Sequence, residues 1–171
     1  MTVLNRTLLA LALLGTLTLT ACDMTDPGPD PTPDDLTVTF DWSGRIQIIE
    51  DCEAGGSNTG DFRFKVDVEA EIDGVDQDVT VLDRDFAANT GTSVGVGSPT
   101  EFTVPSGASA SFTVSFFALE RDAISADDLD VTGTERHTFS SDRLSPTGSQ
   151  SIRLTDGSNC IVELRYTAST S

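Results

Sequence analysis

From Leu36 to the C-terminus, apolar residues recur at every second position in short runs. The clearest run places Phe62, Phe64, Val66 and Val68 in alternation with polar residues. Successive side chains of a strand point to opposite faces, so a period of two puts one apolar face against a core. No long stretch has the helical period of 3.6 residues. We therefore predict an all-β fold, an antiparallel β-sandwich.

Turn residues divide this region into nine expected strands. We place them at 36–42, 45–51, 62–72, 78–86, 100–105, 109–119, 130–139, 149–155 and 160–168. If successive strands alternate in direction, one end of the sandwich holds the connections 52–61, 87–99, 120–129 and 156–159. The turns at 43–44, 73–77, 106–108 and 140–148 then lie at the other end. About 135 residues is the size of one domain with a single core.

The first 22 residues have the organisation of a secretory signal, because Arg6 precedes an apolar run over 8–14 and small residues follow it. The end of this segment, Leu19-Thr20-Ala21-Cys22, resembles the lipobox of bacterial lipoproteins. The resemblance implies that residues 1–21 are removed, that Cys22 is lipidated, and that the protein is anchored to a membrane of the cell envelope. The alternative is an ordinary signal peptide in which Cys22 is incidental.

Residues 22–35 are predicted to be the lipidated cysteine followed by a tether. The segment from Asp23 to Asp35 contains four prolines and five aspartates and has no apolar periodicity. Such a composition cannot join a core and favours an extended chain. The folded domain is therefore expected to span 36–171.

The charge of the chain excludes several classes of function. There are 28 Asp and Glu residues against 10 Lys and Arg residues, and the formal net charge is −18. This charge repels phosphate backbones, so nucleic acid is not an expected partner. His137 is the single histidine, which leaves little basis for a Ser-His-Asp triad or a histidine zinc site. We therefore expect a protein that is not an enzyme. His137 is expected on the surface of a strand. Trp42 and Tyr166 are expected to be aromatic residues of the core or of a sheet edge.

Two cysteines remain if Cys22 carries lipid. Cys52 and Cys160 stand at predicted strand ends that the alternation places at the same end of the sandwich. An even pair of cysteines outside the cytoplasm favours a disulfide, which requires the two Cα atoms to lie within about 7 Å. The alternative is a pair of buried free thiols.

Acidic residues gather on the predicted loops at this end. Calcium takes six to eight oxygen ligands, several of them loop carboxylates. The segment from Phe112 to Asp128 resembles the sixth strand and third calcium loop of C2 domains, which implies Glu120, Asp122 and Asp128 as ligands. Residues 60–66 are similar to the exit of the first calcium loop of that family. This second similarity implies Asp61 as a bridging ligand, with Glu53 as a substitute for the other acid of that loop.

The segment also departs from the C2 pattern. Glu120 stands where an Asp is usual, and Arg121 brings a positive charge between two implied ligands. The basic strand that many C2 domains use for phosphoinositides is missing. The resemblance implies a C2-like sandwich, and an immunoglobulin-like sandwich is the alternative fold. A solvated acidic loop is the alternative to a calcium site.

The sequence thus predicts a membrane-anchored, exported lipoprotein with a non-catalytic β-sandwich binding module, dependent on Ca²⁺ through its acidic loops. One alternative is a calcium-independent structural or protein-interaction domain of the cell envelope. Another is an accessory domain of a hydrolytic system. The sequence leaves open the protein partner in the envelope, the membrane leaflet and the oligomeric state.

Overall fold

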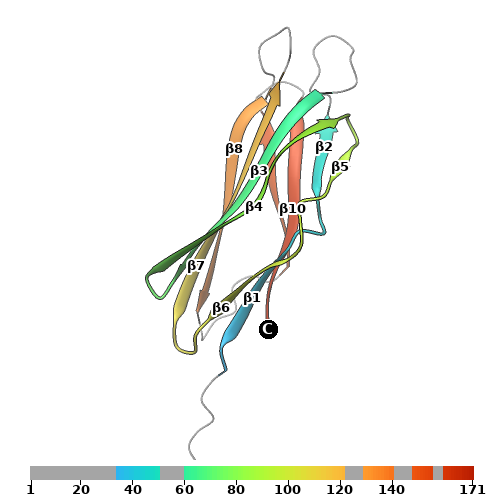
Figure 1. Ribbon diagram of the computed structural model, residues 1–171. Coiled ribbons are helices and arrows are strands. Elements are labelled where there is room, and N and C mark those ends of the chain that lie inside the picture. Colours follow the sequence, from blue (N-terminus) through green and yellow to red (C-terminus); the bar gives the residue numbers. More distant parts are fainter. Residues whose placement is uncertain (1–33, 51–59, 122–128, 141–147, 156–159) are drawn as a thin grey trace, which may run out of the picture. The chain divides into compact units, whose positions relative to one another are not determined.

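Figure 1 shows the computed structural model, which describes residues 34–50, 60–121, 129–140, 148–155 and 160–171. Every regular element in these ranges is a strand. The ten strands are β1 (Leu36–Asp41), β2 (Ile46–Glu50), β3 (Gly60–Ile72), β4 (Val75–Ala88), β5 (Ser93–Val94), β6 (Thr100–Val104), β7 (Ser109–Arg121), β8 (Leu129–Ser140), β9 (Gly148–Thr155) and β10 (Ile161–Thr170). Residues 32–171 form one compact unit. No helix in the described ranges has the length and hydropathy to cross a membrane.

The strands form two antiparallel sheets arranged as a sandwich, which confirms the predicted fold class. The four-stranded sheet has the order β4-β3-β7-β8. The six-stranded sheet has the order β5-β2-β10-β1-β6, and β9 pairs with the other edge of β10. Nine of the ten strands coincide with the predicted ones to within a few residues, and the two-residue β5 is the one the sequence analysis missed.

The prediction that 43–44 is a hairpin turn is wrong. Both β1 and β2 pair antiparallel with β10, since Asp41 lies opposite Thr167 and Ile46 lies opposite Leu164. The two strands therefore run in the same direction along one edge of β10. Residues 42–45 interrupt a single strand path as a bulge and do not reverse the chain. From β2 onward the long strands alternate in direction, as the sequence analysis assumed.

The core lies between the sheets and is built from the inward positions of the alternating strands. In β3, residues 62, 64, 66 and 68 are at most 2% exposed. Aromatic rings join the two sheets, because Phe40 of β1 lies 5.5 Å from Phe112 of β7 between ring centroids. At one edge of the sandwich β8 packs on β9, where a Cβ atom at Gly133 would meet Ile152 and Leu154.

The β3–β4 hairpin is the longest pairing in the four-stranded sheet. Asp73 and Gly74 form its turn with φ angles of 51° and 76°, a pair of left-handed conformations that suits a tight hairpin. Next to the turn, residues 75–78 of β4 are all exposed. The predicted turn at Asp73-Gly74 is confirmed.

Candidate functional site

The predicted calcium end contains two of the implied ligands among the described residues, and they point in opposite directions. Asp61 is the second residue of β3 and lies opposite Arg121 of β7, while Phe62 lies opposite Glu120. Asp61 is exposed on the outer face of the four-stranded sheet. Glu120 takes the next inward position and is 0% exposed. The sheet therefore separates the two carboxylates and does not bring them to one point.

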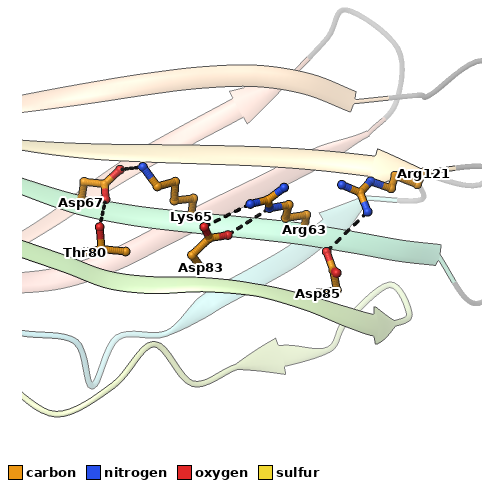
Figure 2. Close-up of polar contacts among 7 residues, drawn as sticks. All are labelled: Arg63, Lys65, Asp67, Thr80, Asp83, Asp85 and Arg121. Carbon is orange, nitrogen blue, oxygen red and sulfur yellow. Dashed lines mark hydrogen bonds and ion pairs between the residues drawn. The ribbon is translucent and has the colours of Figure 1, made fainter.

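Asp61 instead faces a shallow outer pocket of about 340 Å³ that also contains Asp85 and Arg121. Nη1 of Arg121 lies 3.7 Å from Oδ1 of Asp85, and Figure 2 shows the guanidinium directed toward that carboxylate. Phe62 and Phe86 form part of the pocket wall. The Arg121 guanidinium thus lies in the same pocket as Asp61, the one residue of this pocket that was expected to bind a metal ion.

The other implied residues lie outside the described ranges. These are Cys22, Cys52, Glu53, Asp122 and Asp128. Cys160, directly before β10, is 1% exposed. Within the described ranges, no group of three or more His, Cys, Asp or Glu side chains is placed to hold a metal ion.

Charged side chains line the outer face of the four-stranded sheet in a row along β3 (Figure 2). Arg63 donates from Nε to Asp83 at 2.9 Å, and Lys65 pairs with Asp67 at 2.7 Å. Asp67 also accepts a bond of 2.7 Å from the Thr80 hydroxyl. The bond from Arg63 lowers the pKa of the Asp83 carboxyl. All these groups are open to solvent, and exposed pairs of this kind contribute little to stability.

The outer face of the six-stranded sheet carries a different arrangement, which the sequence analysis missed. Arg165 of β10 donates from Nε and Nη2 to the same oxygen, Oε2 of Glu163, at 2.9 and 2.7 Å. The side chain of Glu163 is only 12% exposed. The hydrogen bond from Arg165 lowers the pKa of the Glu163 carboxyl, although burial opposes the shift. The sequence does indicate this pair, because Glu163 and Arg165 have opposite charges and stand two residues apart on the predicted strand 160–168.

The expected surface position of His137 is wrong, because its ring lies in the core and is 2% exposed. Its Nε2 lies 2.7 Å from the hydroxyl of Tyr166, which joins β8 of one sheet to β10 of the other. Burial lowers the pKa of His137 and raises that of Tyr166. The inward positions of β8 include Gly133 and Glu135, so the usual apolar signal of a core face is absent there.

The predicted interior placement of Trp42 and Tyr166 is confirmed, since each is 1% exposed. Their ring centroids lie 5.3 Å apart. Nε1 of Trp42 donates to the hydroxyl of Thr100 at 3.0 Å, so the indole keeps a polar partner inside the sandwich.

Comparison with known protein families finds no matching family model, and comparison with curated proteins finds no matching sequence. Function is therefore inferred from the order of segments along the chain and from the polar groups that the two sheets present. Those groups are the charged row on the four-stranded sheet and the Glu163–Arg165 pair on the six-stranded sheet.

Proposed function

We propose that the protein is an exported lipoprotein whose β-sandwich is a non-catalytic binding module at the bacterial cell envelope. The observation that carries the proposal is the order of segments. A signal-like segment ending in Cys22 precedes a Pro- and Asp-rich stretch, and a single compact unit follows from residue 32. This order suits a folded module held at a distance from a membrane by a Pro-rich tether.

The surface of the sandwich supports a binding role. Its outer faces carry charged groups that neighbouring side chains hold in place, such as Arg63 by Asp83 and Arg165 by Glu163. Groups whose orientation is fixed before contact lose less conformational entropy when a partner binds. A rigid two-sheet scaffold with such faces is the usual basis of a recognition module.

Lipidation is tested by expressing the full chain in a bacterial host fed an alkyne fatty acid and detecting the label on the protein. We expect label on the parent chain and partition into the membrane fraction. The Cys22→Ser variant should lose both, because both depend on the proposed acyl group at Cys22, whereas the matched Cys52→Ser variant should keep both. Label that persists in Cys22→Ser, or parent chain that carries none, contradicts the anchor.

We also propose a disulfide between Cys52 and Cys160. The pairing of β2 with β10 supports it, since Glu50 lies opposite Ile161 and the two cysteines follow and precede these residues by one or two positions. The bond would close a loop of about 108 residues. In the chain-entropy model this contributes about 5 kcal/mol to stability. Peptide mapping under non-reducing conditions should recover the linked pair, and recovery of two free thiols contradicts it.

We also propose calcium binding at the loop end, with a smaller ligand set than the sequence implies. Because Asp61 faces outward and Glu120 inward, one ion at this end would use Glu120, Asp122 and Asp128 without Asp61. Calcium at a hundred times its Kd would then stabilise the fold by about 2.7 kcal/mol. Thermal unfolding in EDTA and in calcium tests this.

The response to calcium should vanish in Asp122→Asn/Asp128→Asn and persist in Asp61→Asn. If the parent and the double variant respond alike, the acidic residues serve solubility and the module is independent of calcium.

A further inference from the structure

The outer face of the six-stranded sheet contains a polar groove of about 560 Å³. One wall is the bulge at Ser43 and Gly44, and the other is the edge strand β9. Glu163 and Arg165 of β10 lie between these walls. A volume of several hundred Å³ is in the range of small-ligand sites.

The bulge wall is tightly constrained. A Cβ atom at Gly44 would collide with the backbone carbonyl of Arg165, so the bulge rests directly on β10. Arg45 has a φ of 63°, and its carbonyl accepts a bond of 3.0 Å from the Arg165 amide. Left-handed non-glycine residues and bulges concentrate at functional sites, where they fix a side chain or a wall of a pocket.

The floor of the groove presents an oriented guanidinium. Glu163 holds Nε and Nη2 of Arg165, while the Arg165 side chain remains 52% exposed. Among the described residues, none bonds to Nη1 of Arg165. The planar head therefore offers donors to the groove in a direction that the buried carboxylate sets.

Hydroxyl groups surround this head. Ser151 lies opposite Arg165 on β9, and Ser149 lies opposite Thr167. Ser43 contributes a third serine from the bulge. The Ser151 hydroxyl donates to the Glu163 carboxylate and keeps its oxygen as an acceptor. Because a hydroxyl can both donate and accept, the groove matches a ligand that carries many groups of the same kind.

The charges of the groove residues and of the whole chain favour a neutral ligand over an anion. Glu163 and Arg165 cancel each other in the groove, and the chain as a whole has a net charge of −18. Arg153 lies opposite Glu163 on β9, and Arg45 follows the bulge, but an anion would still approach against the field of the whole chain. A neutral polyhydroxylated ligand meets no such penalty.

We propose that this groove is a binding site for a neutral saccharide. The proposal deepens the function proposed above and rests on it, because it assigns a ligand class to the binding module. Arg165 donates to sugar oxygens, and the serine and threonine hydroxyls exchange bonds with the sugar hydroxyls. Tyr166 is 1% exposed and offers no ring face, so we expect weak binding with a Kd on the order of 1 mM.

The test is a two-dimensional amide NMR titration of the full chain carrying Cys22→Ser. The probes are glucose, N-acetylglucosamine and a linear trimer of each, added to tens of millimolar. We expect saturable shifts at the amides of residues 43–45, 149–151 and 165–167, with a larger response to one trimer than to its monomer. Absence of shifts with all four probes, or shifts scattered over both sheets, would overturn the proposal.

Single substitutions test whether the saccharide binds in the groove or elsewhere on the surface. Arg165→Met should weaken the binding of the best probe at least tenfold. Arg63→Met is the matched control, since Arg63 is also paired with a carboxylate and its side chain is 42% exposed, and it should bind as the parent does. If Arg165→Met fails to fold, Ser149→Ala/Ser151→Ala decides, because both serines are exposed on β9 and their loss should weaken binding without affecting the fold.

Two further outcomes are informative. Sulfate or acetate that produces the groove shifts at lower concentration than any sugar would overturn the saccharide and show an anion site. Loss of fatty-acid label at Cys22 leaves the titration unaffected, so failure of the membrane anchor and failure of the saccharide site are distinguishable.

Discussion

The two outer faces of the sandwich use the same chemical pair in different surroundings. On the four-stranded sheet, Arg63 pairs with Asp83, and the two side chains are 42% and 36% exposed. On the six-stranded sheet, Arg165 pairs with Glu163, whose side chain is 12% exposed. Water screens the first pair and reaches the carboxylate of the second only slightly. The comparison shows that local burial, more than the presence of a pair, decides what an ion pair contributes.

The difference in burial follows from the strands next to each pair. Arg63 and Asp83 lie on neighbouring strands, β3 and β4, of which β4 is the edge of its sheet. Glu163 lies on β10, between β2 on one side and β9 on the other, where Gln47 and Arg153 lie opposite it. Glu163 is therefore less exposed to solvent because its strand has a neighbour on each side.

The largest expected effect comes from the bulge beside this pair. Gly44→Ala places a methyl group against the Arg165 backbone, which cannot move without disturbing β10. We expect the free energy of unfolding to fall by about 2 to 3 kcal/mol. Urea denaturation followed by tryptophan fluorescence measures this, since Trp42 adjoins the bulge.

The control lies in the four-stranded sheet. Gly74 has a φ of 76° with open space around its Cβ position, so Gly74→Ala meets only the cost of a left-handed alanine, about 1 kcal/mol. Equal losses at the two glycines would mean that the bulge is free to shift and that the groove wall is not rigid.

The core residue His137 and the carboxylates of the outer faces should change the stability of the fold in different pH ranges. Burial lowers the pKa of His137 in the folded state, an effect that Glu135 on the same strand partly opposes. The unfolded chain then binds the proton at higher pH than the folded chain does. The His137 contribution is complete above the unfolded pKa of 6.5 and is lost as the pH falls below it. His137→Gln should therefore flatten the stability profile between about pH 7 and pH 5.

The outer-face carboxylates act at lower pH. Their hydrogen bonds lower the pKa values of Glu163 and Asp83, so their stabilisation is present above the unfolded values of 4.5 and 3.8 and is lost only as the pH falls through the folded ones. Glu163→Gln should leave the slope between pH 7 and pH 5 intact. If the free energy of unfolding of His137→Gln depends on pH just as that of the parent does, a group other than His137 causes the change between pH 7 and pH 5.

The strands were predictable from the sequence because each core strand repeats its apolar residues with a period of two. Phe62 to Val68 in β3 is the clearest example, and its inward residues are those the pattern indicates. The bulge at Ser43-Gly44 was not predictable, since the same two residues suit a hairpin. Only the long-range pairing with β10 distinguishes the two structures.

The site was less predictable than the fold. Spacing placed Asp61 and Glu120 at the same end, but the strand register puts them on opposite faces of the sheet. His137 was predicted on the surface because it alternates with apolar neighbours in the sequence, but the strand turns it inward. Its partner, Tyr166, comes from the opposite sheet, and such a contact has no local signal in the sequence.

Removing the acidic charge of each ion pair compares their contributions to stability directly. Glu163→Gln keeps the shape of the side chain and removes the charge that holds Arg165. We expect a loss of about 1 kcal/mol, because the solvent around the Arg165 head screens part of the attraction. Asp83→Asn removes the matched charge on the four-stranded sheet and should leave the urea midpoint unchanged. Equal losses from the two substitutions would contradict the role of burial.

The smallest expected effect is at the far end of the charged row, near the β3–β4 turn. There Glu69 lies opposite Asp78, and Glu71 lies opposite Asp76, so like charges face each other across the strands. Like charges in direct opposition destabilise a sheet by a few tenths of a kcal/mol. Asp78→Lys replaces repulsion with attraction and should raise the free energy of unfolding by about 0.5 kcal/mol at low salt.

Salt provides the check on this gain. Exposed charges are screened within about 3 Å at 1 M salt, so the advantage of Asp78→Lys should disappear there. Asp78→Asn removes repulsion without adding attraction and should give a smaller gain. A gain that survives high salt would come from packing of the lysine stem, whereas no gain at low salt would mean that the exposed hairpin already separates its charges.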